Sequence, residues 1–189
     1  MVAIDDSLQN KVPIISFKDV TFSWPGKPYR VINNCNFSID KTGLWMIVGK
    51  NGSGKSTLLK LINGLLKPTN GFINNLADVG MVFQNPDHQI LMPNCRSELL
   101  LNINKKLSRK DIIDKIDIAL NKVGLAGFEK RPIHTLSGGQ KQRLTIACSL
   151  ISDKNFILLD EPTALLDSSS QLKVLEIIKD LTKNKRNPF

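Results

Sequence analysis

The chain has 189 residues, which is enough for one domain, or one domain with a subdomain, around a substantial core. Its 41% hydrophobic and 23% charged residues are typical of a globular protein, and apolar runs such as residues 44–48 are far too short to cross a bilayer. The net charge of +9 is spread along the sequence and aromatic residues are few, so the composition disfavours a dedicated nucleic-acid-binding surface.

The terminal segments and the cysteines indicate the cellular compartment in which the protein is expected. Residues 1–12 read as a loose leader without the pattern of a signal peptide. The densest basic run, 183–186, indicates a solvated helix end, or alternatively attraction to an anionic membrane surface. The three cysteines are widely spaced and form no CxxC pair, which predicts small buried hydrophobes in a reducing compartment. They are Cys35, Cys95 and Cys148.

The N-terminal third predicts strands. Residues 14–23 are rich in β-branched and aromatic side chains and predict a strand, which the Trp-Pro-Gly-Lys-Pro sequence at 24–28 ends in a turn. A second extended stretch is expected near residues 35–39. The uniformly apolar run 44–48 predicts a buried parallel strand.

A glycine-rich loop at 49–57 fits the pattern G-x-x-x-x-G-K-[ST]. Its glycines allow backbone N–H groups to turn inward onto a polyphosphate, and the helix that follows adds positive potential. Lys55 is expected to reach the β- and γ-phosphates, and the Ser56 hydroxyl to meet Mg²⁺. A Gly/Ser-rich turn with an incidental lysine is the alternative, but an apolar strand before the loop and an apolar helix after it favour nucleotide binding. The predicted nucleotide contacts are Gly49, Asn51, Gly52, Ser53, Gly54, Lys55, Ser56 and Thr57.

Strands and helices then alternate. Leucines and isoleucines at helical spacing, through Leu65 and Leu66, predict a helix that begins at Lys55 and that Pro68 and Gly71 stop. The pattern predicts an α/β fold with a mostly parallel sheet, an antiparallel N-terminal part and a helical insertion. The later predicted elements are strands near 71–74 and 78–83, mostly helical structure over 85–127 with a helix capped by Ser108, a helix at 140–151, a buried strand at 155–160 and an amphipathic helix at 171–183.

Two carboxylates follow the last of these strands. Asp160 ends the apolar run Phe-Ile-Leu-Leu, and a carboxylate at the C-terminal end of a buried strand lies at the ligand crevice of an open α/β sheet. Asp160 is expected to hold Mg²⁺, and Glu161 to act as the general base on the attacking water. An acidic pair that merely starts a loop before Pro162 is the alternative.

The sequence Leu-Ser-Gly-Gly-Gln at 136–140 supplies a second anion-binding cap ahead of a helix. A simple Ser/Gly N-cap would explain the local structure but not the motif. With the loop at 49–57 before it and 82 residues between Lys55 and Ser137, it makes the chain resemble the ATP-binding-cassette (ABC) ATPases. The resemblance implies that Ser137, Gly138, Gly139 and Gln140 cap the γ-phosphate held by a second such subunit.

The same resemblance gives roles to further positions. Trp24 stands where the family stacks an aromatic ring on adenine, with a half-buried core indole as the alternative. Gln84 stands at the position that senses Mg²⁺ and water and relays to the helical insertion. Residues 164–167 resemble the D-loop, with Leu165 where a small residue is usual, and Asp167 either orders the opposing site or caps a helix.

The stretch 82–89 resembles ATPase subunits of energy-coupling-factor transporters, the cobalt, nickel and vitamin uptake group, particularly cyanobacterial-looking members. This resemblance implies an ATP- and Mg²⁺-dependent ATPase that energises a membrane importer. It would be peripheral to the cytoplasmic face, with transmembrane subunits and a second ATPase subunit as partners. The insertion from Gln84 to Leu101 would receive a helix of the membrane partner, with Leu99, Leu100 and Leu101 as apolar surface or, alternatively, as core. Two other functions remain as alternatives. One is an ABC-type ATPase acting on nucleic acid, and the other is a nucleotide-binding module that does not hydrolyse ATP.

The family's switch histidine follows a strand expected near or beyond position 190, and neither His88 nor His134 stands there. We therefore expect a single ABC domain over 1–189 that is incomplete at its C-terminus, binds ATP and hydrolyses it poorly; a naturally short subunit is the alternative. Its expected parts are 13–83, with the antiparallel strands, the mainly helical 84–150, and the core continuation 151–189.

Overall fold

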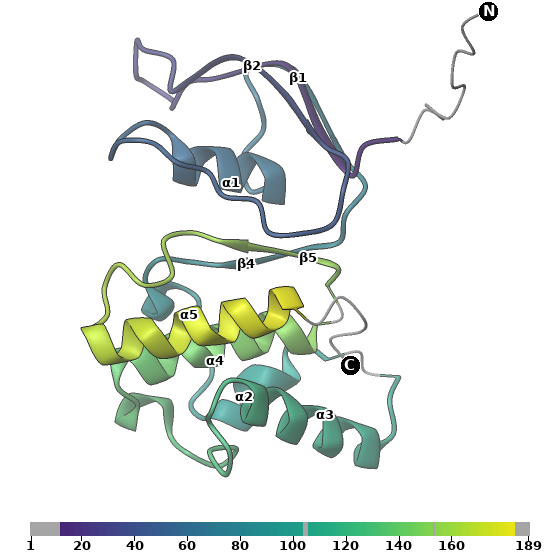
Figure 1. Ribbon diagram of the computed structural model, residues 1–189, viewed down its shortest axis with the longest axis vertical. Coiled ribbons are helices and arrows are strands. Elements are labelled where there is room, and N and C mark those ends of the chain that lie inside the picture. Colours follow the sequence, from purple (N-terminus) through teal and green to yellow (C-terminus); the bar gives the residue numbers. More distant parts are fainter. Residues whose placement is uncertain (1–11, 104–105, 153, 184–189) are drawn as a thin grey trace, which may run out of the picture. The chain divides into compact units, whose positions relative to one another are not determined.

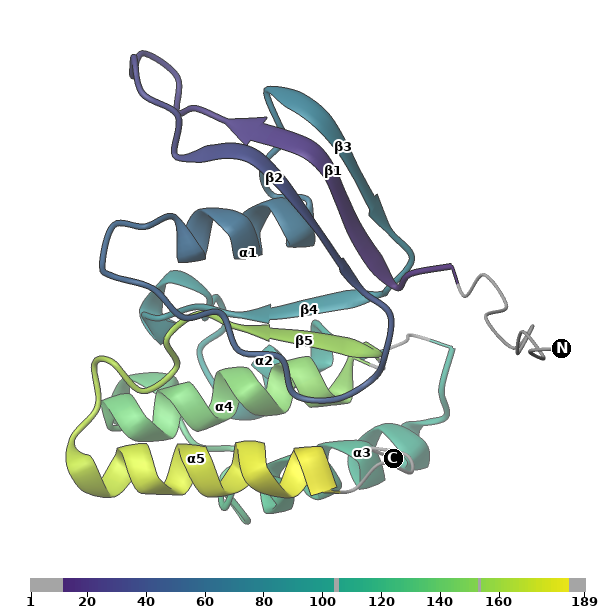
Figure 2. The same ribbon diagram turned by 45° about the horizontal axis from the view of Figure 1, so that its top comes forward.

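The computed structural model describes residues 12–103, 106–152 and 154–183 (Figures 1 and 2), and the strand and histidine predicted after Lys183 lie outside these ranges. The chain divides into two compact units, an N-terminal unit of residues 1–77 and a C-terminal unit of residues 78–189. None of the helices in the described ranges is both long and apolar enough to span a bilayer.

An antiparallel sheet of three strands forms the N-terminal unit, as predicted. It consists of β1 (Ile15–Phe22), β2 (Ile32–Ile39) and β3 (Asn70–Asn75) in the order β2-β1-β3 (Figure 2). Ile15 of β1 lies opposite Ile39 of β2 and Asn75 of β3, and it is fully buried. The Phe17 and Phe37 rings stack across β1 and β2 with their centroids 4.5 Å apart. Alternating apolar side chains on β1 thus supply one face of the core.

Helix α1 (Lys55–Asn63) follows the glycine-rich loop and buries Leu59, Leu61 and Ile62. It ends earlier than predicted, because Gly64 takes the left-handed conformation with φ 81° and terminates the hydrogen-bond ladder. Leu65 and Leu66 therefore lie beyond the helix, and Leu65 is exposed. The periodic pattern continued past the true end of the helix.

The prediction of a buried strand at 44–48 is wrong in this structure. These residues form no strand, and their side chains are between 40% and 80% exposed. An apolar run predicts burial only where a neighbouring strand can satisfy its backbone N–H and C=O groups, and the described residues of the N-terminal unit place no such strand beside it. Trp45, expected to be buried, is 53% exposed, and its indole Nε1 donates to the Lys41 carbonyl at 3.1 Å.

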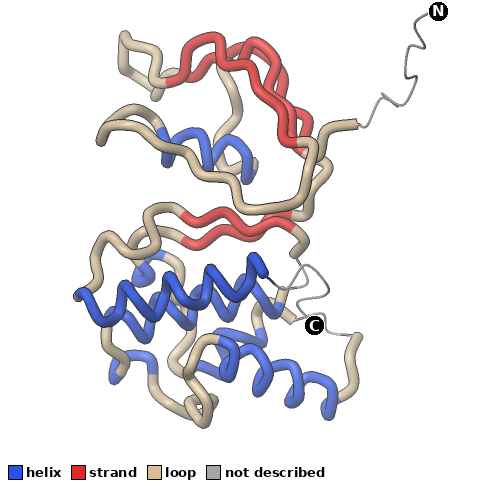
Figure 3. The backbone as a smooth tube through the Cα atoms, viewed as in Figure 1, coloured by secondary structure: helices blue, strands red, loops and turns tan. Residues whose placement is uncertain are grey.

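The C-terminal unit carries the parallel part of the fold. Strands β4 (Val79–Val82) and β5 (Phe156–Leu159) pair in parallel, with Val79 opposite Phe156 and Val82 opposite Leu159 (Figure 3). This sheet has two strands in the described ranges. Together with the antiparallel sheet and the helices it confirms the predicted α/β class.

Helices form the rest of the C-terminal unit (Figure 1). They are η1 (Pro86–His88), α2 (Cys95–Leu100), α3 (Arg109–Lys122), η2 (Ile133–Thr135), α4 (Gly138–Ile151) and α5 (Ser168–Lys183). Helix α4 is buried along nearly its whole length, and its side chains share one apolar cluster with those of α2, α3 and α5. Ser108 caps α3 as predicted, accepting the N–H of Asp111 at 3.2 Å. Cys95 and Cys148 belong to this cluster, and burial raises the pKa of the Cys148 thiol, whereas Cys35 is half-buried.

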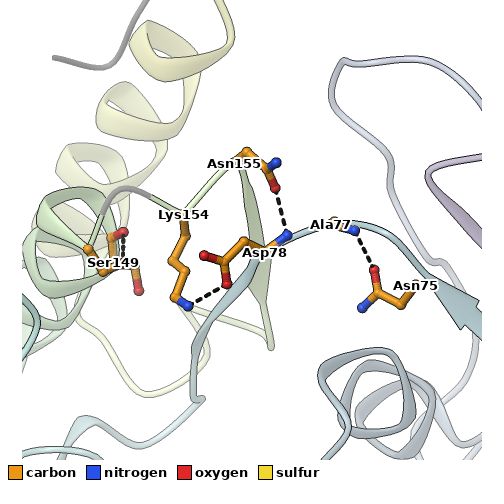
Figure 4. Close-up of polar contacts among 7 residues, drawn as sticks. Asn75, Ala77, Asp78, Ser149, Lys154 and Asn155 are labelled. Carbon is orange, nitrogen blue, oxygen red and sulfur yellow. Dashed lines mark hydrogen bonds and ion pairs between the residues drawn. The ribbon is translucent and has the colours of Figure 1, made fainter.

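Polar contacts join the starting ends of β4 and β5 (Figure 4). The Asn155 side chain accepts the N–H of Asp78 at 2.9 Å, and the Asp78 carbonyl accepts the N–H groups of Asn155 and Phe156. Lys154 forms an ion pair with the Asp78 carboxylate. These contacts set the register of the parallel pair, so that residues after Val82 and after Leu159 emerge at the same edge.

Candidate functional site

The glycine-rich loop of the N-terminal unit already has the form of a phosphate cradle. Gly54 adopts φ 94°, and a Cβ added there would lie 3.0 Å from Ile32 and 3.1 Å from Val31, so both backbone and space require glycine. The Lys55 ammonium turns back over the loop and donates to the carbonyls of Gly49 at 3.2 Å and Lys50 at 3.3 Å. An anion in the loop would meet this ammonium and the N-terminal end of α1, whose first turn has no acidic residue.

The predicted contacts of this loop differ in exposure. Asn51, Gly52 and Ser53 are exposed, and Gly54 to Ser56 are half-buried. Thr57 is 7% exposed and packs into the core at the start of α1. The exposed tip and the half-buried floor give the loop an open side toward solvent.

Trp24 lies directly after β1 and is 37% exposed. Its indole meets the Phe22 ring edge-on, with centroids 5.2 Å apart and an interplanar angle of 86°. The Trp24 carbonyl accepts the N–H of Lys27 at 3.0 Å and closes the turn that follows. The indole is thus held on one edge and remains open enough to stack on a planar ligand.

The predicted residues of the C-terminal unit lie after the ends of β4 and β5. Gln84 follows β4, and Asp160 and Glu161 follow β5. The Gln84 amide Nε2 lies 3.4 Å from Glu161 Oε2, so the structure brings these two predicted residues together. Asp160 is 7% exposed and donates its backbone N–H to the Val82 carbonyl at 3.0 Å, which fixes it to the end of β4. The two carboxylates therefore differ in setting, one nearly buried and one half-buried.

Glu161 has a strained backbone. Its φ of 45° lies in the left-handed region, which non-glycine residues with long side chains rarely occupy. Such a conformation costs on the order of 1–3 kcal/mol and persists only where the surroundings impose it. Strain of this kind is concentrated at functional sites, which supports a role for the Glu161 carboxylate.

The oxygen donors present fit Mg²⁺. The Asp160 carboxylate and the Gln84 amide follow the ends of β5 and β4 in the C-terminal unit, and in the N-terminal unit Ser56 carries a hydroxyl at the start of α1. Mg²⁺ prefers oxygen ligands and is usually held by one or two carboxylates together with substrate phosphates and water. Each unit thus carries oxygen donors of the kind that Mg²⁺ accepts.

Two side chains that sequence reasoning missed hold the backbone of Phe83, the residue before Gln84, and a third holds the loop that follows. The fully buried Gln142 donates from Nε2 to the Phe83 carbonyl at 3.1 Å, while Gln89 accepts the Phe83 N–H at 3.2 Å. Lys141 pairs with Asp87 at 2.7 Å. The sequence does contain a hint of this role, because Gln142 is a polar residue on the helix face that is otherwise mostly apolar.

Ser137 begins α4 with a capping box. Its hydroxyl accepts the N–H of Gln140 at 3.3 Å, and the Gln140 side chain accepts the N–H of Ser137 at 3.0 Å. The alternative of a simple Ser/Gly N-cap therefore describes the local structure, in which both side chains cap the first turn of α4. Gly138 is exposed and Gly139 is buried.

Asp167 caps α5, as one of its two predicted readings states. Its carboxylate accepts the Ser170 N–H at 3.0 Å and the hydroxyls of Ser169 and Ser170, each at 2.8 Å. The hydrogen bond from the Ser170 backbone N–H contributes most to lowering the pKa of the Asp167 carboxyl, and the two hydroxyls lower it further. Together they hold this pKa well below its usual range. His88 and His134 lie exposed in η1 and η2.

The family model described as ABC transporter matches residues 32–164 of the chain. The chain belongs to the ABC transporter family. This match spans the phosphate loop, Gln84, the signature segment and both carboxylates, so the motifs that carried the resemblance lie within it. The N-terminal unit of this ABC protein contributes the loop and Trp24, and the C-terminal unit contributes the remaining predicted residues.

Known proteins extend the comparison. The chain is 37% identical over 186 residues to the energy-coupling factor transporter ATP-binding protein EcfA of Methanocaldococcus jannaschii, which covers 90% of this chain and 66% of that protein. It spans 58% and 66% of the length of the first two curated relatives it matches.

Two solved structures share the fold. The cbiO1 protein of Clostridium perfringens, part of the ABC transporter complex cbiONQ, has a TM-score of 0.78 at 29% identity, over 91% of this chain and 74% of that one. A dimeric ATP-binding cassette in a post-hydrolysis state, bound to ADP and Pi, has a TM-score of 0.76 at 27% identity, over 90% of this chain and 83% of that one. The family is thus supported by sequence and by fold.

Proposed function

We propose that this ABC protein is the ATP-binding and ATP-hydrolysing subunit of a membrane importer of the energy-coupling-factor type, acting at the cytoplasmic face with transmembrane subunits and a second ATPase subunit. The observation that carries the proposal is the pairing of Gln84 with the strained Glu161 beside the nearly buried Asp160. The name of the EcfA relative and the cbiO1 neighbour support the importer class.

The residues have distinct roles in the proposed reaction. Lys55 and the loop N–H groups bind the β- and γ-phosphates of ATP, and Ser56, Gln84 and Asp160 would hold Mg²⁺, which when bound neutralises phosphate charge. Glu161 accepts a proton from water as the water oxygen attacks the γ-phosphorus and the bond to the ADP oxygen breaks. Ser137–Gln140 caps the γ-phosphate of the ATP held by the second subunit.

Release of inorganic phosphate from ATP tests this function. The chain, reconstituted with transmembrane subunits in vesicles, should release phosphate only when both ATP and Mg²⁺ are supplied, and the vesicles should raise the rate. Stimulation by DNA instead of by the membrane subunits would point to the nucleic-acid class. Binding of ATP with no release under any condition would contradict the hydrolytic role.

Trp24 gives a prediction about adenine. If the base stacks on the exposed indole, Trp24→Ala should weaken ATP binding by about 1–3 kcal/mol, the range for stacking of a base on an aromatic side chain, and Trp24→Phe should weaken it less. Binding is measured by titration, and ATP should quench the Trp24 fluorescence. Trp45→Phe is the control, because Trp45 is also exposed but lies outside the turn. A fluorescence change that survives Trp24→Phe and disappears in Trp45→Phe would contradict stacking.

The segment 90–101 is proposed to contact the membrane partner. Glu98 is 4% exposed, and its Oε2 accepts the N–H groups of Leu91 at 2.9 Å and Met92 at 2.8 Å, so it holds this loop in place. Of the three leucines at 99–101, Leu99 is fully buried and follows the core alternative, because it faces the core from α2, whereas Leu100 and Leu101 are 38% and 51% exposed. Leu91 is 77% exposed.

Cross-linking tests this contact. Leu91→Cys and Leu101→Cys should each form cross-links to a transmembrane subunit in the reconstituted complex, in a background in which the half-buried Cys35 is replaced by serine. Leu172→Cys on α5 is the control, since Leu172 is equally apolar and 62% exposed. Equal cross-linking from all three positions, or none from 91 and 101, would contradict the assignment.

A further inference from the structure

The two glycines of the signature segment have different surroundings. A Cβ added at Gly138 would meet nothing within 4 Å. A Cβ added at Gly139 would lie 2.6 Å from Ser170 Cβ and closer still to Ser170 Oγ. Real Cβ atoms do not approach other atoms so closely. Position 139 therefore has to be glycine because Ser170 of the same chain occupies the space of a side chain, whatever a ligand also requires.

Ser170 cannot easily turn away from Gly139. Its Oγ donates to Asp167 Oδ2 at 2.8 Å and its N–H donates to Asp167 Oδ1 at 3.0 Å, so rotation of the side chain would break the hydroxyl hydrogen bond. The Asp167 carboxylate is ionised, and hydrogen bonds to a charged acceptor are the stronger kind. Gly139 thus rests against a side chain whose rotamer is fixed.

Ser170 lies in the first turn of α5, directly after the loop that leads away from the carboxylates. Gln171, the next residue, donates from Nε2 to the Leu166 carbonyl at 3.0 Å and to the Thr163 carbonyl at 3.3 Å. These bonds close residues 163–167 onto the start of α5. Farther along, Val174 is fully buried in the cluster that holds the α4 side chains, so α4 and α5 pack together (Figure 2).

We propose that Ser170 is a positioning residue that locks the signature segment to the loop 161–167 of the same chain. The contact of Ser170 with Gly139, and its bonds to Asp167, make α4 and this loop move as one piece. A displacement of the signature segment on the γ-phosphate of the second subunit is then transmitted to the loop that begins at Glu161. The inference rests on the proposed function, because it concerns turnover of ATP.

Compensating substitutions test the contact. Gly139→Ala should lower kcat about tenfold, the effect of overpacking a fixed site, with a smaller change in the KM for ATP. Ser170→Gly alone should also lower kcat, because it removes the hydroxyl hydrogen bond to Asp167, and an unchanged kcat in this variant would overturn the positioning role. It removes the obstructing Cβ and Oγ as well, so adding Gly139→Ala to Ser170→Gly should lower kcat little further. In a Ser170→Ala background, which keeps the Cβ, Gly139→Ala should lower kcat more. This graded loss distinguishes a clash with Ser170 from one with a ligand.

Gly138→Ala is the matched control. Its added Cβ meets nothing in the chain, so whatever effect it has should be the same with and without Ser170→Gly. A kcat defect of Gly139→Ala that Ser170→Gly leaves unchanged would overturn the proposal, because the added methyl would then obstruct the ligand directly.

Melting temperatures of all variants complete the test. Gly139→Ala should lower the melting temperature of the unsubstituted chain by more than it lowers that of Ser170→Gly, a comparison that remains valid if Gly139→Ala folds poorly. Absence of ATP turnover in every variant, the unsubstituted chain included, contradicts the proposed function. Even then, an equal lowering of the melting temperature in both backgrounds would overturn the contact itself.

Discussion

Replacing Glu161 by glutamine is expected to lower kcat for ATP hydrolysis by about 10²–10⁴-fold, the usual contribution of a general base. Glutamine has nearly the same shape, so the contact with Gln84 at 3.4 Å and the strained backbone can persist, but it cannot accept the proton of the attacking water. ATP affinity should change little, since Lys55 and the loop bind the phosphates. Single-turnover release of phosphate measures the chemical step apart from binding.

Glu176→Gln is the control for this change. Glu176 lies exposed on α5, so the substitution removes the same charge outside the site. It should leave kcat near that of the unsubstituted chain. Equal rates for Glu161→Gln and Glu176→Gln would show that another group takes the proton.

Lys55→Ala should abolish most of the stabilisation that Mg-ATP gives the fold. Nucleotide at 100-fold excess over Kd raises the free energy of unfolding by about 2.7 kcal/mol when it binds only the folded state. Without its ammonium the loop loses the side chain that donates to the Gly49 and Lys50 carbonyls, and with it the cation that would face the phosphates. Thermal unfolding with and without Mg-ATP measures the shift.

Lys60→Ala on the same helix controls for loss of a positive charge near the loop. Its shift with Mg-ATP should match that of the unsubstituted chain. The nucleotide-free melting temperature of Lys55→Ala must be recorded as well, because the lysine also makes two hydrogen bonds in the free loop. A full shift in Lys55→Ala would refute the proposed phosphate contact.

The elements predicted best are those that local physics determines. β1 and α3 follow from side-chain periodicity and a serine cap, and the loop at 49–57 was recognised from the spacing of its glycines and lysine. The end of α1 was misplaced because one glycine in the left-handed conformation outweighed a continuing apolar pattern. Local signals thus give the type of an element more reliably than its boundary.

The failures concern partners distant in sequence. The run at 44–48 was expected to be buried, yet burial of a strand depends on a neighbour that its own residues do not specify. The contact of Gly139 with Ser170 joins positions 31 residues apart, and the bond from Gln142 to Phe83 joins positions 59 apart. A single sequence contains no signal that two such distant residues are in contact. The motif residues could be predicted because each motif is recognised from residues that are adjacent in the sequence.

The left-handed backbone at Glu161 sets the stability of the fold against the catalytic role proposed for this residue. Glycine there would relax the peptide and raise resistance to heat, but it would remove the carboxylate. Engineering that selects for thermal tolerance alone would therefore drift toward an inert nucleotide-binding protein at residue 161. A thermostable version of this subunit has to find its added stability elsewhere in the chain.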